Sequence, residues 1–186
     1  MSTRKIVAAL FISLDGVVES PDKWHFPYFN EEMGEAVMAA MGESDAMMMG
    51  RVNYQEWSQF WPAQPSDDPF AARMNGVQKY VVSTTLDKVE WNNSTLINGD
   101  IVAEITKLKQ QPGKDISISG SGTLVQSLLD LGLLDELRLL VHPIVVGSGK
   151  RLFADASQQQ ALTLNSSQVF STGVVYLTYQ PERQAS

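Results

Sequence analysis

Apolar and polar residues follow one another along the chain in blocks that predict strands and helices in turn. A near-continuous apolar run rich in β-branched residues covers Lys5–Leu14 and is typical of a strand buried on both faces. Shorter runs predict further strands at Ala46–Met49, Lys79–Ser83, Thr95–Ile97 and Asp115–Ser119. Helical spacing of apolar residues between these runs predicts helices at about 31–41, Val52–Phe60, Asp100–Lys109 and Gly122–Leu131.

The C-terminal part of the chain carries strand patterns without helices between them. A long strand is expected at Glu136–Val146, and two more at Ala161–Val169 and Val174–Tyr179, the last two joined by a hairpin turn at 171–173. The proline-rich segment Pro62–Pro69 is expected to be a surface loop. Alternating strands and helices that end in antiparallel strands indicate an α/β fold with a mostly parallel sheet.

Length and composition narrow the class of protein. The 186 residues fit one domain over 1–186, and a net charge of −7 argues against nucleic acid as the partner. The chain has no cysteine and only two histidines, which excludes thiolate chemistry and makes a multi-histidine metal site improbable. The first apolar run is too short for a leader or a membrane span and is followed at once by Asp15, so we expect a cytoplasmic protein.

Three predicted strand ends carry groups that suit phosphate. Gly120, Ser121, Gly122 and Thr123 lie between a strand and a helix, where glycine lets a ligand approach the backbone and free N–H groups attract phosphate. Taken alone, these glycines fit a tight turn as well as a phosphate site. Gly50-Arg51 opens a second helix with a cation, and Ser83-Thr84-Thr85 follows a third strand with hydroxyls. Together the three ends favour a shared dinucleotide.

The stretch Ile118–Phe153 (ISGSGTLVQSLLDLGLLDELRLLVHPIVVGSGKRLF) resembles the C-terminal reductase domain of the bifunctional riboflavin-pathway deaminase-reductases. It is similar, more closely still, to stand-alone bacterial proteins of the dihydrofolate-reductase-like family. Phe11–Gly16 and Gly50-Arg51 match the same family, so the resemblance spans nearly the whole chain. It implies a dihydrofolate-reductase-like three-layer fold with helices on both faces of the sheet, NADPH as hydride donor and, commonly, a homodimer.

The resemblance also implies which residues hold the cofactor. Adenine-side phosphates are expected to meet the stretch Gly50, Arg51, Val52 and Asn53, with Arg51 as the main cation. The turn near the adenosine ribose and its 2′-phosphate matches Ser83, Thr84 and Thr85. The pyrophosphate turn matches Gly120, Ser121, Gly122 and Thr123.

The substrate half matches the family less well. Riboflavin-pathway reductases usually carry Lys where this chain has Val17 and Glu where it has Ser119. True dihydrofolate reductases place a carboxylate on the first helix, and the candidates here are Glu31, Glu32 and Glu35. The spacing does not single one of them out, so no catalytic acid is assigned.

Four further residues are candidates for the substrate side. Asp15 ends the first strand as a proton relay, an anchor or a simple turn residue. Trp24 and Phe29 belong to an aromatic segment that either stacks on a flat ring or packs as a lid or dimer contact. Tyr54 lies one helical turn after Arg51 and either faces the ligand or packs in the core.

These patterns predict an NADPH-dependent reductase of a small planar heterocycle. The nearest reaction is that of 5-amino-6-(5-phosphoribosylamino)uracil reductase in riboflavin biosynthesis, and dihydrofolate reduction comes second. The rival hypothesis is a non-catalytic nucleotide-binding dimer that keeps the fold, because Val17 and Ser119 leave no obvious proton donor.

Overall fold

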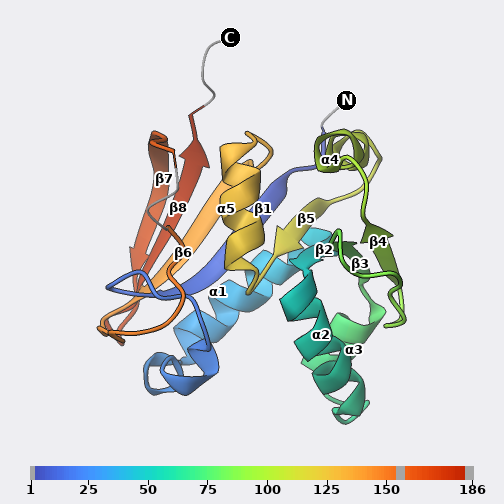
Figure 1. Ribbon diagram of the computed structural model, residues 1–186. Coiled ribbons are helices and arrows are strands. Elements are labelled where there is room, and N and C mark those ends of the chain that lie inside the picture. Colours follow the sequence, from blue (N-terminus) through green and yellow to red (C-terminus); the bar gives the residue numbers. More distant parts are fainter. Residues whose placement is uncertain (1–2, 154–157, 183–186) are drawn as a thin grey trace.

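A computed structural model describes residues 3–153 and 158–182 of the chain. Its strands form one eight-stranded sheet in the order β4-β3-β2-β5-β1-β6-β8-β7 (Figure 1). The strands are β1 Ile6–Ser13, β2 Ser44–Gly50, β3 Gln78–Val82, β4 Ser94–Ile97, β5 Asp115–Ile118, β6 Glu136–His142, β7 Leu162–Val169 and β8 Val175–Pro181.

The direction of the strands confirms the predicted sheet. All pairs from β4 through β6 are parallel, whereas β8 runs antiparallel to both β6 and β7. The carboxyl ends of six strands therefore lie along one edge of the sheet, where open α/β sheets bind their ligands. We call this side the carboxyl edge.

The helices cover the two faces of the sheet. On one face α4 and α5 pack against Ile6, Ala8 and the other even-numbered core positions of β1, β2 and β5. On the opposite face α1, α2 and α3 pack against odd-numbered positions of β2 and β3 and against β6. The bounds are α1 Glu31–Gly42, α2 Arg51–Phe60, α3 Pro69–Gly76, α4 Ile101–Lys109 and α5 Gly122–Asp130, with short 3-10 turns at Pro21–Lys23 (η1), Phe26–Tyr28 (η2) and Trp61–Ala63 (η3).

This arrangement is the expected three-layer fold. Among the helices that the structure describes, none has the length and apolar character needed to cross a membrane.

The sequence-based prediction was wrong about two elements of the fold, the end of β6 and the segment before β3. The strand predicted to reach Val146 ends at His142, because Pro143 has no N–H and the chain turns there, with the Ile144 amide donating to the His142 carbonyl. The segment predicted as loop begins with η3 and leads into α3, which was not predicted. Asp68 caps that helix by accepting from the Phe70 and Ala71 amides, and Pro69 occupies its first turn.

Candidate cofactor and substrate site

Two turns at the carboxyl edge are joined into one unit. β2 and β5 are neighbours, so the turn that opens α2 lies beside the turn that opens α5. The Gly50 amide donates to the Ser121 hydroxyl at 3.1 Å, and the Asn53 side-chain amide donates to the Ser119 carbonyl at 2.9 Å. Gly120 has φ +74, and a Cβ built on it would lie 3.1 Å from the Asn53 Oδ1. A side chain at this position would therefore strain the backbone and press on Asn53.

The helices that begin in these turns lack side-chain caps. In contrast, α1, α3 and α4 begin at Asn30, Asp68 and Asp100, and each of these side chains accepts from first-turn amides. α2 begins after Gly50, and the Ser121 hydroxyl that precedes α5 is turned toward Gly50 rather than into its own helix. Uncapped N–H groups and the positive end of the helix dipole favour an anion at both starts.

A cation stands at the start of α2. Arg51 is exposed, and its guanidinium donates only locally, to the Gln55 Oε1 at 3.1 Å in the described residues. Val52 beside it is 57% exposed, so neither side chain is committed to the core. Arg51 is therefore free to turn toward an anion at this edge.

The turn after β3 lies next to this cation, because Val82 pairs with Gly50 in the sheet. Ser83 is buried, and its hydroxyl accepts from the Thr85 and Leu86 amides at 3.2 and 3.1 Å. It shapes the turn and has little capacity left for a ligand. Thr84 and Thr85 are exposed, but the Thr85 hydroxyl is hydrogen-bonded to that of Ser83 at 3.3 Å, so Thr84 supplies the less engaged hydroxyl.

The carboxylate of Asp15 is used in hydrogen bonds that stabilise the fold. It accepts from the Ser13 hydroxyl at 2.6 Å and from the Val146 and Gly147 amides at 3.0 and 2.9 Å. These hydrogen bonds, led by that of Ser13, lower the pKa of Asp15 to about 2. An ionised carboxylate that ties the loop after β6 to the end of β1 serves as an anchor of the fold, and it is a poor proton donor at neutral pH.

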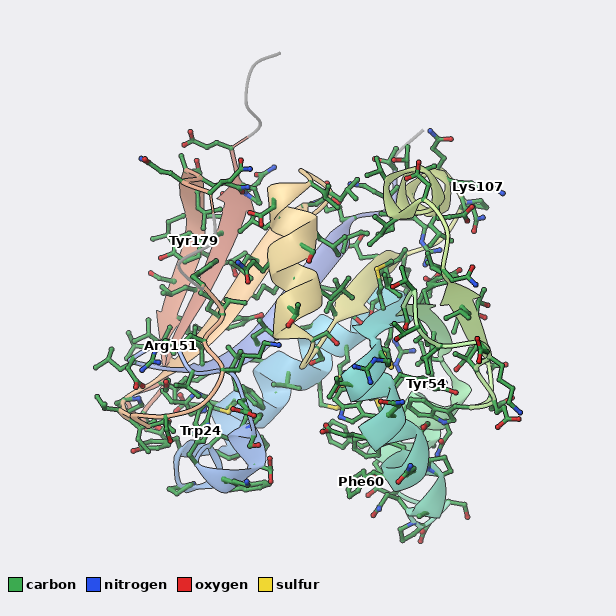
Figure 2. All side chains as sticks on the ribbon, viewed as in Figure 1. Trp24, Tyr54, Phe60, Lys107, Arg151 and Tyr179 are labelled. Carbon is green, nitrogen blue, oxygen red and sulfur yellow. The ribbon has the colours of Figure 1, made fainter. Side chains whose placement is uncertain are left out.

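The three predicted aromatic contacts do not gather in one place. Trp24 lies below the ends of β1 and β6, whereas Tyr54 lies on α2 toward β3 and β4 (Figure 2). Trp24 is buried and donates from its indole to the Glu19 carbonyl at 3.1 Å. Phe29, on the same segment as Trp24, is 47% exposed. Only this segment, 20–30, remains a candidate substrate wall.

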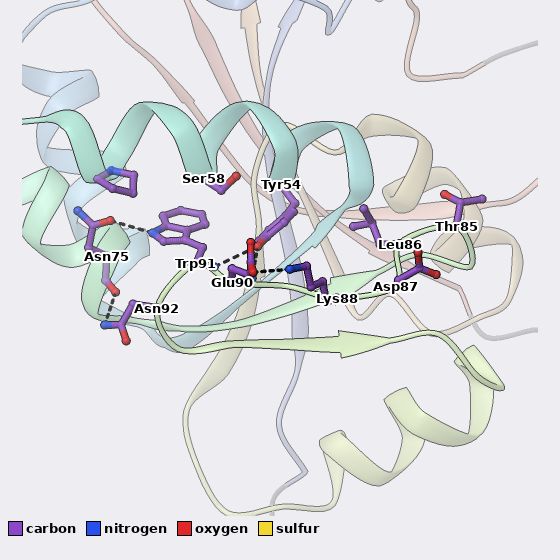
Figure 3. A pocket seen from close by; sticks show the side chains of 11 residues that line it. Tyr54, Ser58, Asn75, Thr85, Leu86, Asp87, Lys88, Glu90, Trp91 and Asn92 are labelled. Carbon is purple, nitrogen blue, oxygen red and sulfur yellow. Dashed lines mark hydrogen bonds and ion pairs between the residues drawn. The ribbon is translucent and has the colours of Figure 1, made fainter.

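Tyr54 belongs to a different cavity. Its hydroxyl accepts from the Glu90 and Trp91 amides at 2.8 and 3.1 Å, and its ring packs in the core, which favours the packing interpretation (Figure 3). The open cavity beside it, of about 1010 Å³, lies between α2 and the loop 85–92. Sequence reasoning missed this cavity.

The centre of the sheet is partly uncovered on the α1 and α2 side. Ala9 and Phe11 of β1 and Ser119 after β5 keep part of their surface exposed, although β1 and β5 are central strands. Glu31, Glu32 and Glu35 of α1 are exposed, and Glu32 accepts from the Ser171 amide at 3.0 Å. We call the partly exposed surface formed by Ala9, Phe11 and Ser119 the floor of the site; it consists of apolar side chains and one hydroxyl.

The fold and this edge define an α/β protein of the dihydrofolate-reductase-like class. The chain belongs to the family of RibD C-terminal domains, whose model matches residues 4–176. The uncharacterized protein YyaP of Bacillus subtilis is 33% identical over 185 residues, covering 96% of both chains.

Solved structures share the fold. A putative riboflavin biosynthesis protein from Shewanella sp. PV-4 has a TM-score of 0.78 at 22% identity, covering 96% of this chain and 99% of that one. The diaminohydroxyphosphoribosylaminopyrimidine deaminase/5-amino-6-(5-phosphoribosylamino)uracil reductase of Thermotoga maritima has a TM-score of 0.67 at 12% identity, covering 96% of this chain and 57% of that one. The fold and the family predicted from the sequence are therefore confirmed.

Proposed function

We propose that the chain is an NADPH-dependent reductase of a small planar heterocycle. One observation carries the proposal: two helices begin without side-chain caps in turns that are bonded to each other at the carboxyl edge. Two uncapped helix starts side by side suit a diphosphate, which carries negative charge on two adjacent groups. Membership in the RibD C-terminal domain family supports a reductase.

The residues at the edge fit the parts of that cofactor. The N–H groups of Gly122 and Thr123 would meet the diphosphate, and Arg51 with Thr84 and Thr85 would surround the 2′-phosphate. The hydride would come from the bound nicotinamide. The chain's own part is to hold the ligands in line over the sheet and to exclude water. Asn53, Ser121 and Ser83 would act indirectly, by fixing the turns.

The substrate would lie on the partly exposed floor at Ala9 and Ser119, beside the Phe11 ring that His25 covers on one face and beside the segment that carries Trp24 and Phe29. An apolar and aromatic surface of this kind suits a flat ring. The nearest reaction is reduction of a ribosylaminopyrimidinone, as the activity named for the Thermotoga maritima protein suggests. Dihydrofolate reduction is the second candidate. NADPH oxidation with either acceptor would contradict the rival, a non-catalytic nucleotide-binding dimer.

Arg51→Ala is expected to weaken NADPH binding about 10- to 100-fold and NADH binding less than about threefold. Loss of a charged hydrogen bond removes roughly 1.5–3 kcal/mol, and NADH lacks the 2′-phosphate that Arg51 would contact. Titration of both cofactors by fluorescence measures the two ratios. Gln55→Ala is the matched control, because it removes the present partner of Arg51 and leaves the cation in place. Equal losses for NADPH and NADH would remove this role from Arg51.

We infer that the protein forms a homodimer through β7. This edge strand, LTLNSSQV, is exposed along its length from Thr163 and contains neither charge nor proline, the features that normally prevent edge pairing. Sedimentation should give twice the 20.5 kDa chain mass, and the double variant Leu164→Lys with Val169→Lys should give the chain mass. Leu131→Lys, at the end of α5 where the side chain is 46% exposed, should remain dimeric. A monomeric wild type would contradict the inference.

A further inference from the structure

Both histidines of the chain are buried close together, His25 on segment 20–30 and His142 at the end of β6. His25 is 7% exposed and His142 is fully buried. The His25 ring stacks on Phe11 with centroids 4.6 Å apart and an angle of 16° between the planes, and it lies 4.3 Å from the Phe26 ring. The two imidazoles are 6.0 Å apart and nearly perpendicular.

The walls around His142 are aromatic as well. Its ring meets the rings of Phe11, Trp24 and Tyr28 edge-on at 5.5, 5.2 and 5.8 Å. Its Nδ1 lies 2.8 Å from the Leu140 carbonyl and therefore carries the proton in the neutral ring. The remaining nitrogen of His142, Nε2, is thus an acceptor surrounded by rings.

One nitrogen of each histidine is without a hydrogen-bond partner. These are the Nδ1 of His25 and the Nε2 of His142, both fully enclosed. A second proton on either ring would create a buried cation at a nitrogen that has no hydrogen-bond partner within the described residues. Burying a charge in this way is strongly unfavourable, so the closed arrangement requires both rings to be neutral.

The groups that face the pair add to this preference. Burial lowers the pKa of His25, and the neighbouring His142 lowers it further, whereas Asp22 on the same segment opposes the shift. Burial also lowers the pKa of His142, whereas hydrogen bonding to the carbonyls of Leu140 and Ile12 acts in the opposite direction. Tyr28, the other titratable group in contact, donates its hydroxyl to the Pro143 carbonyl at 3.4 Å.

Segment 20–30 is buried in the fold through two residues, of which His25 is one. Its 3-10 turns η1 and η2 contain no buried residue, and Trp24 and His25 are the residues that it buries. Its side chains make four hydrogen bonds to described residues outside the segment: Trp24 donates to the Glu19 carbonyl at 3.1 Å, Tyr28 to the Pro143 carbonyl at 3.4 Å and Asn30 Nδ2 to the Ser171 hydroxyl at 3.0 Å, and Asn30 Oδ1 accepts from the Met33 amide at 3.0 Å. Removing the imidazole from its pocket therefore breaks one of the two buried contacts of the segment and leaves Trp24 as the other.

We propose that His25 and His142 form an acid-sensitive latch, in which two neutral imidazoles hold segment 20–30 against the ends of β1 and β6 and protonation releases it. The latch stands independently of the reductase activity. If the segment also borders the substrate, as proposed above, release would open that side of the site. When segment 20–30 is released, the two imidazoles bind protons at the ordinary histidine pKa near 6.5. The closed state is therefore fully favoured above this pH and becomes less stable as the pH falls below it.

Hydrogen–deuterium exchange of the amides in 22–29 tests the latch. With rates corrected for chemical exchange, wild-type protection should fall up to about tenfold per pH unit and per histidine between pH 6.5 and 5. In His25→Phe, whose ring can still stack on Phe11 but cannot take a proton, the histidine 25 contribution should be lost and the fall should be visibly shallower. The strand β5 serves as the internal control and should stay protected in both proteins. Equal protection at pH 8 and pH 5, or the same fall in both proteins, would overturn the proposal.

Proton NMR gives a second readout that needs no variant. The chain has two histidines, so two imidazole C2 signals report the pair directly. Both are expected to titrate below pH 6.5, together with the loss of protection. Titration of either ring at or above pH 6.5 while segment 20–30 stays protected would overturn the latch. Both experiments use the protein without NADPH, so a failure of the proposed reductase function would leave these results unaffected.

Discussion

Gly120→Ala is expected to weaken NADPH binding about 10- to 150-fold. The residue has φ +74, where an L side chain costs roughly 1–2 kcal/mol, and the added Cβ would press on the Asn53 Oδ1 at 3.1 Å. Either the turn or Asn53 must shift, and the diphosphate N–H groups shift with them. Losing one or two such hydrogen bonds, each worth about 1.5 kcal/mol, gives the stated range. A fluorescence titration of the variant with NADPH measures it.

Gly132→Ala is the matched control. Gly132 has a similar positive φ of +66, but an added Cβ there meets no atom within 4 Å. The residue follows α5 at the end away from the carboxyl edge, so its substitution carries the backbone penalty alone. The control should lose about 1–2 kcal/mol of unfolding free energy and keep its NADPH affinity within about twofold. Equal losses of affinity in both variants would show that the contact with Asn53 has no role in the cofactor site.

Lys79→Met is expected to lower the free energy of unfolding by about 2–4 kcal/mol at pH 7. Lys79 is fully buried in β3, and its ammonium donates to the carbonyls of Asn75, Val77 and Asn92 at 3.2, 2.8 and 2.9 Å. It also lies 4.3 Å from the centre of the Trp91 ring. Methionine fills the space but leaves acceptors without donors, at roughly 1–3 kcal/mol each for those that water does not reach. Urea unfolding measures the difference.

Lys88→Met supplies the control for this change. Lys88 is three-quarters exposed and pairs with Glu90 on the surface, so its loss should change stability by at most about 1 kcal/mol. If Lys79→Met is no more harmful than this control, the three carbonyl contacts do not stabilise the fold.

The contribution of Lys79 to the stability of the wild type should also depend on pH. Burial lowers the pKa of Lys79 from 10.5 to about 8, so the unfolded chain binds more protons than the folded chain between these values. The stability of the wild type relative to Lys79→Met should therefore rise as the pH increases from about 8 to 10.5. An advantage that shrinks over this window would contradict the assignment.

The strands and the carboxyl edge could be predicted because they depend on local pattern and on the direction of parallel strands. Gly50 and Gly120 each follow an apolar run, and parallel strands place their ends together. The asymmetric roles of neighbouring side chains could not be predicted. Asn53 and Ser121 bind each other's turns through contacts that exist only after β2 and β5 have paired. In the same way, the Ser83 hydroxyl is used by its own turn while Thr84 stays exposed.

Other features had weak or opposing signals in the sequence. Helical spacing placed Tyr54 one turn after Arg51, but its orientation depends on the loop amides of Glu90 and Trp91, which come from beyond β3. Lysine is rarely buried, so nothing in the pattern marked Lys79 as part of the core. Asp68-Pro69 does mark the start of α3 in the sequence, but the prolines before it led to the prediction of a loop.

Direct binding of NADPH to the wild-type protein tests the central claim most simply. The titration follows the fluorescence of the reduced nicotinamide, with no acceptor present and with Gly120→Ala measured in parallel. We predict saturable binding with a Kd of roughly 1–100 μM, the range in which such cofactors usually act. Absence of saturable binding at millimolar NADPH would contradict the account, because the two uncapped helix starts would then have no diphosphate to hold and Arg51 no 2′-phosphate.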